Sequence, residues 1–161
     1  MSFIALLIGA VIVAADQIIK YFVVNNLKPL GSVSVIDNLF KLTYVENRGV
    51  AFGMFNDMRW FFVVLTSVLI AAIIIFMFIK RPGGMLFYIA AGLIIGGGIG
   101  NLIDRILYGY VIDYLSLSFF SPVCNFADYA ITIGVVLLAV YVIFFTGYLK
   151  SNKKDLKNDK A

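Results

Sequence analysis

The stretch WFFVVLTSVLIAAIIIFMFI, at residues 60–79, is 20 residues long and contains no charged side chain. A helix needs roughly 20 apolar residues to cross the hydrocarbon core of a bilayer. The whole chain of 161 residues is 62% hydrophobic, whereas soluble domains are about 45–50% apolar. Both observations predict an integral membrane protein.

Three further stretches have the length and composition of membrane spans: residues 3–24, 85–106 and 126–149. No basic residue precedes the first of them, and its apolar character continues past Asp16, so we expect it to remain as a span and not to be cleaved as a signal peptide. The sequence predicts one all-α membrane domain of four transmembrane helices, residues 1–150, and no second domain.

The basic residues indicate the orientation of these spans. Seven of the 13 lysines and arginines lie between the second and third spans or just after the fourth: Lys80, Arg81, Lys150, Lys153, Lys154, Lys157 and Lys160. The positive-inside rule makes this side cytoplasmic, so both termini are expected there. Residues 151–161 are expected to form a disordered cytoplasmic tail. Their charge reflects topology, and no nucleic-acid partner is expected.

The outward-facing segment at residues 28–58 has features of its own. SVSVI at 32–36 and FKLTYV at 40–45 are rich in β-branched and aromatic residues, with a turn at Asp37-Asn38 between them. We expect a small antiparallel β ribbon outside the membrane. VAFGMF at 50–55 is expected to form an interfacial helical segment.

Histidine is absent, and Cys124 is the only cysteine. These counts exclude an internal disulfide, a cysteine-based metal cage and catalysis by Ser-His-Asp or Cys-His groups. We expect no metal and no cofactor. An enzymatic reaction would have to use carboxylates, lysine or hydroxyl groups.

Polar residues inside the spans converge on one face of the membrane. Each charge costs roughly 2.5–3.5 kcal/mol at mid-bilayer, so these residues must be paired or solvated. Span direction places all of them near the outer interface: Asp16, Lys20, Asn101, Asp104, Arg105, Asn125 and Asp128. Gly92, Gly96 and Gly100 form a row that continues to Asp104 and should support close packing of a neighbouring helix.

The carboxylates fall into two groups. Asp16 and Lys20, at i and i+4, are expected to form a structural ion pair, and Asp104 must find a partner other than the adjacent Arg105. Asp113 and Asp128 have no basic residue near them in the sequence. Two such carboxylates brought close together share a proton and can act as general base and general acid in amide hydrolysis. The alternatives are a small proton- or ion-coupled transporter and a purely structural membrane subunit.

Five short motifs resemble those of lipoprotein signal peptidases (signal peptidase II). DQIIK at 16–20 is similar to D-Q-x-x-K, and NRGVAFG at 47–53 to N-x-G-x-A-[FW]-G. GNLIDR at 100–105 is similar to G-N-x-x-D-R, VIDY at 111–114 to V-x-D-F, and NFAD at 125–128 to F-N-x-A-D without its first residue. The motifs occur in the family's order and are spread from Asp16 in the first span to Asp128 at the start of the fourth.

This resemblance implies an aspartic endopeptidase that cleaves the signal peptide from bacterial prolipoproteins just before the lipid-modified cysteine. Asp113 and Asp128 would be catalytic, and the other matching positions would bind substrate or support the site: Asn47, Gly49, Asn101, Arg105, Asn125, Asp16, Lys20 and Asp104. Of the charged residues other than the two catalytic aspartates, Arg105 is the one expected to touch substrate. The β ribbon would be a cradle and residues 47–55 a lid. The resemblance implies a bacterial cytoplasmic-membrane protein with lipidated prolipoprotein and membrane lipid as partners. We expect a monomer, and the span directions predict an active site near the outer face.

Two positions depart from the family's motifs. Cys124 stands where the family usually has Phe, and Tyr114 stands where Phe usually follows the first catalytic aspartate. Neither departure affects a proposed proton-transfer group. Cys124 is not expected to be a nucleophile, because no histidine or other evident base is available to lower its pKa.

Overall fold

A computed structural model describes residues 1–49 and 58–145 of the chain. Within these residues, four helices are long and apolar enough to cross a membrane, as predicted. They are α1 Ser2–Phe22, extended by a π-helical turn Val23–Leu27; α2 Arg59–Lys80; α3 Met85–Leu107; and α4 Phe126–Val140, extended by a π-helical turn Tyr141–Phe145. The expected interfacial segment at 50–55, the end of the fourth predicted span and the tail at 151–161 lie outside the described residues.

The central helix of the bundle is α3. In an apolar stretch of 18 residues within α3, 61% of the residues are buried. In the corresponding stretches of the other three spans, 11–17% of the residues are buried. Helix α3 packs against α1, α2 and α4. The outer helices therefore leave most of their apolar side chains exposed, which suits a surface in contact with lipid.

Small residues bring the helix backbones into direct contact. A Cβ atom placed on Gly92 would lie 2.7 Å from the carbonyl oxygen of Ala5, and one on Gly96 would lie 2.8 Å from that of Gly9. On the other side of α3, a Cβ atom on Gly97 would lie 2.5 Å from the carbonyl oxygen of Ala127. The expectation that the glycine row supports close packing is confirmed.

The last glycine of this row lies against a buried carboxylate, and this contact makes a testable prediction. A Cβ atom on Gly100 would lie 2.5 Å from Oδ2 of Asp16. We expect Gly100→Ala to lower the free energy of unfolding by about 1–3 kcal/mol, measured by thermal unfolding in detergent micelles. Gly98→Ala is the matched control, because there the nearest atom is the mobile Cδ1 of Ile70 at 3.1 Å. Equal stability of the two variants would contradict the prediction.

Outside the bundle lies a four-stranded antiparallel sheet. Its strands are β1 Ser32–Ile36, β2 Phe40–Asn47, β3 Val111–Leu117 and β4 Phe120–Cys124, in the order β1-β2-β3-β4. The predicted ribbon is β1 and β2, and its turn includes Asn38, which has a positive φ of 59°. Asn47 pairs with Val111, so the end of β2 lies beside the start of β3.

The sheet is larger than the sequence predicted. We expected a two-stranded ribbon and a loop between the third and fourth spans, with Asp113 in that loop. Asp113 instead lies on β3, a strand between β2 and β4. The all-α description is corrected accordingly: the domain combines four helices with a four-stranded sheet.

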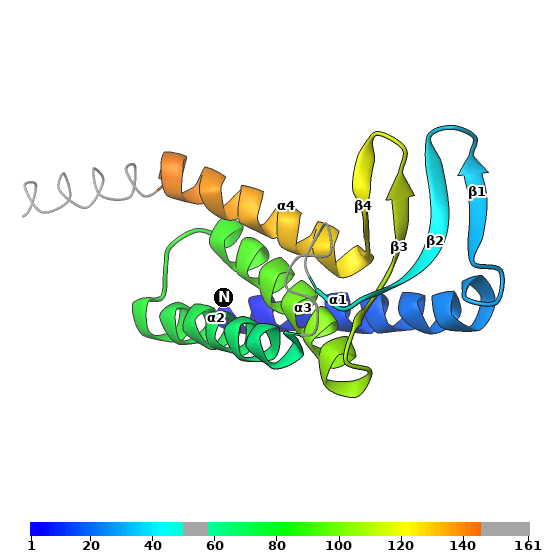
Figure 1. Cartoon of the computed structure of the whole chain (residues 1–161). Coiled ribbons are helices and arrows are strands. Elements are labelled where there is room, and N and C mark those ends of the chain that lie inside the picture. The colour runs from blue at the N-terminus through cyan, green and yellow to red at the C-terminus, as the bar shows by residue number, and fades with distance from the viewer. Residues whose placement is uncertain (50–57, 146–161) are drawn as a thin grey trace, which may run out of the picture.

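The sheet and the N-terminus lie at opposite ends of the bundle (Figure 1). Phe3 lies against Phe78, with ring centroids 6.2 Å apart, so the N-terminus is close to the end of α2. At the other end, Val23 and Leu27 from the end of α1 pack with Ile112 and Tyr114 of β3. This apolar contact fixes the sheet beside the ends of α1 and α3 and the start of α4.

Candidate active site

A cluster of buried polar side chains lies where the sheet meets the helices. Its members come from α1, α3, β3 and the N-terminus of α4, and none is more than 6% exposed: Asp16, Lys20, Asn101, Asp104, Asp113 and Asn125. The convergence predicted from span direction is observed. Burial of so many polar groups requires hydrogen-bond partners for each of them.

Lys20 is the centre of the charged part of this cluster. Its Nζ lies 2.9 Å from Oδ2 of Asp16 and 2.7 Å from Oδ2 of Asp104, and it donates a third hydrogen bond of 3.0 Å to Oδ1 of Asn101. All three ammonium protons therefore have acceptors. The predicted Asp16–Lys20 pair is present, and Lys20 is also the partner that Asp104 needed.

These two carboxylates also hold the backbone next to Asp113 and Asp128. Oδ1 of Asp16 accepts a 3.2 Å hydrogen bond from the backbone N–H of Ala127, and Oδ2 of Asp104 accepts one of 3.1 Å from that of Ile112. Each contact involves the residue immediately before one of the two aspartates. The ion-paired group of Asp16, Lys20 and Asp104 is therefore a frame that positions β3 and α4.

Gln17 also belongs to this frame, although we did not predict it. Its Nε2 lies within hydrogen-bond distance of Oδ2 of Asp16 at 3.2 Å, Oδ1 of Asp104 at 3.1 Å and the carbonyl oxygen of Gly100 at 3.2 Å. The signal in the sequence was its place within the DQIIK motif. Its role depends on the packing of α1 against α3, which sequence spacing does not give.

Among residues 1–49 and 58–145, Asp113 accepts hydrogen bonds from amides and forms no salt bridge. Its Oδ2 accepts a 2.8 Å hydrogen bond from Nδ2 of Asn47, and its Oδ1 accepts one of 2.6 Å from Nδ2 of Asn125. Its side chain is 1% exposed. Burial and repulsion by the Asp128 carboxylate raise the pKa of Asp113 to about 7, against the opposing effect of the amide hydrogen bonds.

Asp128 lies in the first turn of α4 and is only half-buried. Its Oδ2 accepts a 3.1 Å hydrogen bond from the backbone N–H of Asn125, whose side-chain oxygen in turn accepts one of 3.0 Å from the N–H of Asp128. This reciprocal capping box fixes the carboxylate at the helix N-terminus. Its Oδ1 accepts a further hydrogen bond of 2.8 Å from Nδ2 of Asn101.

Two asparagines connect the aspartates. Asn101 donates to Asp128, Asn125 donates to Asp113, and Nδ2 of Asn125 also donates a 3.1 Å hydrogen bond to Oδ1 of Asn101. The structure thus brings Asp113 and Asp128, which are 15 positions apart in the chain, into one hydrogen-bond network. In the part of the chain that the structure describes, the donors to both carboxylates are neutral N–H groups, in contrast to the two carboxylates that flank Lys20.

Arg105 and Gly49 lie at the edge of this network. The guanidinium of Arg105 is 5.3 Å from the ring centroid of Phe62 on α2, and within residues 1–49 and 58–145 no carboxylate forms a salt bridge with it. The backbone N–H of Gly49 donates a 3.1 Å hydrogen bond to Oδ1 of Asn47. Gly49 therefore fixes the orientation of the asparagine that binds Asp113.

Cys124 lies at the end of β4, on the other flank of Asp128. Together they line a pocket of about 270 Å³. The pKa of Cys124 is raised to about 11, because burial disfavours the thiolate and the carboxylates of Asp128 and Asp113 repel it. A thiol in this state is a poor nucleophile at neutral pH. In the described part of the chain, no group of three His, Cys, Asp or Glu side chains is arranged to hold a metal ion.

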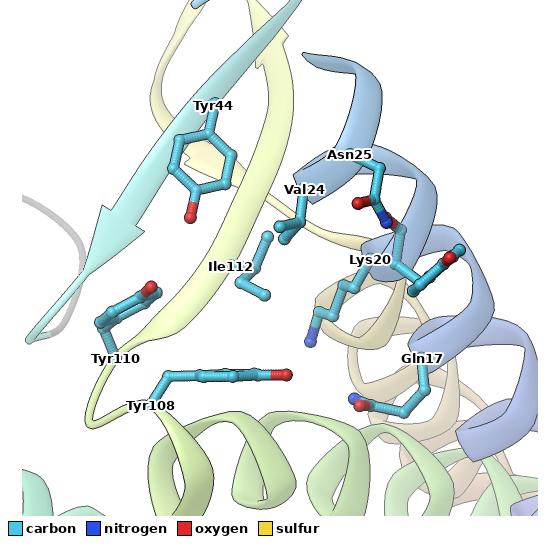
Figure 2. Close-up of a pocket in the computed structure, with 9 residues that line it drawn as sticks. Gln17, Lys20, Val24, Asn25, Tyr44, Tyr108, Tyr110 and Ile112 are labelled. Atoms are coloured by element: carbon cyan, nitrogen blue, oxygen red, sulfur yellow. The ribbon is translucent and has the colours of Figure 1, made fainter. Parts of the chain in front are cut away.

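A second pocket, of about 380 Å³, lies on the α1 side of the frame. Figure 2 shows Gln17 and Lys20 reaching toward it from α1, with Tyr44, Tyr108 and Tyr110 on the opposite side. Neither Asp113 nor Asp128 lines it. The pocket therefore borders the ion-paired frame and is separate from the space beside the two aspartates.

Comparison with known proteins agrees with this architecture. The model of the signal peptidase (SPase) II family matches residues 8–144, which is most of the chain. This chain belongs to the signal peptidase II family. A lipoprotein signal peptidase of Caldanaerobacter subterraneus is 44% identical over 143 residues, covering 89% of this chain and 98% of the relative. One of Halothermothrix orenii is 43% identical over 132 residues, covering 82% and 90%.

Solved structures show the same fold. A bacterial membrane enzyme determined by the in meso method at 2.3 Å resolution superposes with a TM-score of 0.81 at 30% identity, covering 88% of both chains. A second, at 1.9 Å resolution, gives a TM-score of 0.78 at 30% identity, covering 88% of this chain and 93% of the other. The chain is thus a multi-pass bacterial membrane protein of the signal peptidase II family, and family membership makes it a protease.

Proposed function

We propose that this signal peptidase II family member is an aspartic endopeptidase that cuts prolipoproteins immediately before the lipid-modified cysteine, with Asp113 and Asp128 as its catalytic pair. The relatives are lipoprotein signal peptidases, so the substrates are prolipoproteins in a membrane. The comparisons give no support to the alternative of a proton- or ion-coupled transporter. The aspartic mechanism is supported by the surroundings of the two carboxylates.

The observation that carries the proposal is the difference between two pairs of buried carboxylates. Asp16 and Asp104 share the ammonium of Lys20, whereas Asp113 and Asp128 are connected by the amides of Asn101 and Asn125. A pair held by neutral donors retains a proton more easily than a pair neutralised by a cation. It can therefore act as acid and base together.

In the proposed reaction, ionised Asp128 removes a proton from water, and the water oxygen attacks the carbonyl carbon of the scissile bond. Protonated Asp113 donates its proton to the carbonyl oxygen, which gives a tetrahedral diol. When the C–N bond breaks, Asp128 returns its proton to the leaving nitrogen and Asp113 regains one from a diol hydroxyl. Neither metal nor cofactor enters these steps, and the pair ends in its starting protonation state.

The position of the site suits a substrate anchored in the membrane. The sheet lies at the end of the bundle opposite the N-terminus (Figure 1), and Asp113 on β3 and Asp128 in the first turn of α4 belong to the sheet's end. Lys80 is the last residue of α2, and Arg81 after it lines a pocket with Met1 and Ser2 at the N-terminus. With the basic end in the cytoplasm, the active site is near the outer face. Water reaches an interfacial site there, and a lipidated cysteine is held at the same depth.

The pKa of Asp113 predicts the alkaline limb of the pH profile. Because the acid form is present below about pH 7 and is lost above it, we expect kcat/KM to fall as the pH rises through this value. The limb belongs to the coupled pair. Asn47→Ala removes a hydrogen bond that favours the ionised carboxylate and should move the limb to higher pH. A rate that rises through pH 7, or a limb unchanged in this variant, would contradict the assignment.

The proposed function is tested with the purified chain in liposomes. A prolipoprotein carrying a diacylglyceryl-modified cysteine should be cut, while proton and sodium flux across the same liposomes stay at the level of empty ones. Flux without a peptide product would support the transporter reading and overturn the proposal.

A further inference from the structure

The helix that carries Asp128 begins inside the protein. Asn125 and Ala127, at the start of α4, are both 0% exposed. The first four N–H groups of a helix have no partner within it, and a buried donor without a partner is costly. Here the N–H groups of Asn125 and Asp128 bind each other's side chains. The N–H of Ala127 donates to Oδ1 of Asp16, and the remaining one, that of Phe126, needs an acceptor from elsewhere in the fold.

The acceptor for this N–H is a tyrosine on the neighbouring strand. The backbone N–H of Phe126 donates a 3.2 Å hydrogen bond to the hydroxyl oxygen of Tyr114 on β3. Tyr114 directly follows Asp113 in the chain, and Phe126 lies two positions before Asp128. The hydrogen bond therefore joins the strand of one proposed catalytic aspartate to the helix of the other, and neither carboxylate takes part in it.

The ring of Tyr114 is held firmly enough to fix the position of its hydroxyl. Tyr114 is 4% exposed, and it packs with Val23 and Leu27 at the end of α1 and with Ile112 on β3. Successive side chains of a strand point to opposite faces, so Tyr114 and Asp113 lie on opposite faces of β3. Tyr114 thus connects α1, β3 and α4 from the face of the strand that lies away from the Asp113 carboxylate.

We propose that the hydroxyl of Tyr114 positions the catalytic pair by fixing the start of α4 against β3. The inference rests on the proposed function, because it concerns the geometry of Asp113 and Asp128 in that reaction. The side chain of Asn125 also links β3 to α4, but it does so by binding the Asp113 carboxylate, whose charge changes when its proton moves. The hydrogen bond between Phe126 and Tyr114 holds the two elements together whatever the protonation state of the pair.

This hydrogen bond depends on a residue in which the chain departs from the family's motif. The phenylalanine that is usual at position 114 would fill the same space but has no oxygen atom to accept the N–H of Phe126. Tyr114 is a positioning residue, because its hydroxyl acts through the backbone of α4. A misplacement of about 1 Å can lower a rate roughly 100-fold, so a shift of a few tenths of an ångström corresponds to a loss of roughly three- to tenfold.

The test removes the hydroxyl and keeps the ring. For Tyr114→Phe in phospholipid nanodiscs, we expect kcat for cleavage of a diacylglyceryl-modified prolipoprotein to fall roughly three- to tenfold, with KM changed by less than about twofold. Tyr88→Phe is the matched control, because Tyr88 is 3% exposed and lines a pocket with Met1 at the opposite end of the bundle. It should leave kcat and KM unchanged. Both variants are assayed well below their unfolding midpoints, so a loss of stability alone does not lower kcat.

Hydrogen exchange shows whether the bond itself is responsible. The exchange rate of the Phe126 amide is followed by NMR after labelling of phenylalanine with ¹⁵N. This amide should exchange several-fold faster in Tyr114→Phe than in the wild type, because its acceptor is lost. In Tyr88→Phe it should exchange at the wild-type rate.

An unchanged kcat in Tyr114→Phe, a loss that appears in KM instead, or a lower kcat with unchanged exchange at Phe126 would each overturn the inference. The wild type and Asp113→Asn are assayed beside these variants. If the wild type cuts the substrate and Tyr114→Phe has the same kcat, only the positioning role is refuted. If the wild type does not cut it, or Asp113→Asn is fully active, the proposed function is refuted.

Discussion

Asp113→Asn and Asp128→Asn are each expected to lower kcat for cleavage of a lipidated prolipoprotein by at least about 1,000-fold. Asparagine has nearly the shape of aspartate and can neither give nor take the proton that the reaction moves. The measurement is the initial rate of signal-peptide release by the chain in lipid bilayers. Both residues accept hydrogen bonds from amides, and an asparagine keeps one acceptor oxygen and nearly the same shape, so each variant should still fold.

The control for these variants is Asp37→Asn, in the exposed turn between β1 and β2. It removes one carboxylate from the same side of the protein and should leave the rate unchanged. Thermal unfolding and binding of a lipidated peptide should be close to wild type in all three variants. Substantial activity in either Asp113→Asn or Asp128→Asn would refute the catalytic pair.

Lys20→Met is expected to destabilise the protein more than any other single substitution considered. Its side chain is 2% exposed, and its ammonium neutralises two carboxylates whose side chains are fully buried. Breaking a buried ion pair by removing one partner costs about 3–5 kcal/mol, because an uncompensated charge stays in the interior. We expect a large fall in the midpoint of unfolding, measured by heating in detergent micelles.

Two comparisons separate this effect from a general loss of charge. Lys28→Met removes the exposed Lys28–Glu46 pair, at 3.1 Å, and should cost less than about 1 kcal/mol. Adding Asp104→Asn to Lys20→Met removes one of the stranded carboxylates and should restore part of the lost stability. If Lys20→Met were as stable as Lys28→Met, Lys20 would not be the centre of the frame.

The helices and the convergence of the polar side chains could be predicted because both depend on local features. Each span is a continuous apolar run, and the direction of each span places its polar residues at one face of the membrane. The absence of basic residues between Arg105 and Lys150 already separated Asp113 and Asp128 from the other carboxylates. The structure adds the physical difference between the two pairs of carboxylates: Lys20 lies between Asp16 and Asp104 and neutralises them.

Strands β3 and β4 could not be predicted because their local signals conflict. Their connection at Ser118 and Phe119 contains a serine but no Gly, Pro, Asn or Asp, so its turn signal is weak. Pro122 within β4 argues against a strand. It is tolerated because β4 is at the edge of the sheet, where a missing N–H donor costs little. The pairing of β3 with β2 is a long-range contact that neither segment specifies alone.

Gln17 and the partner of Asp104 were missed for a related reason. Both depend on how α1 is rotated against α3, and that rotation is fixed by the contact of Gly92 and Gly96 with Ala5 and Gly9. The glycine row indicated that some helix would pack there. It did not show that α1 would be that helix, nor which of its side chains would reach Asp104.

The central claim is that this chain cuts prolipoproteins with a pair of aspartates. It is tested most directly by mass spectrometry of a diacylglyceryl-modified prolipoprotein after incubation, in EDTA, with the purified wild-type chain and with a chain carrying both Asp113→Asn and Asp128→Asn. For the wild type, we expect two products of one cut, a free signal peptide and a mature protein that begins with the lipid-modified cysteine. We expect neither product from the double variant. An intact substrate with the wild type, a cut at another bond, or the same cut by the double variant would contradict the account.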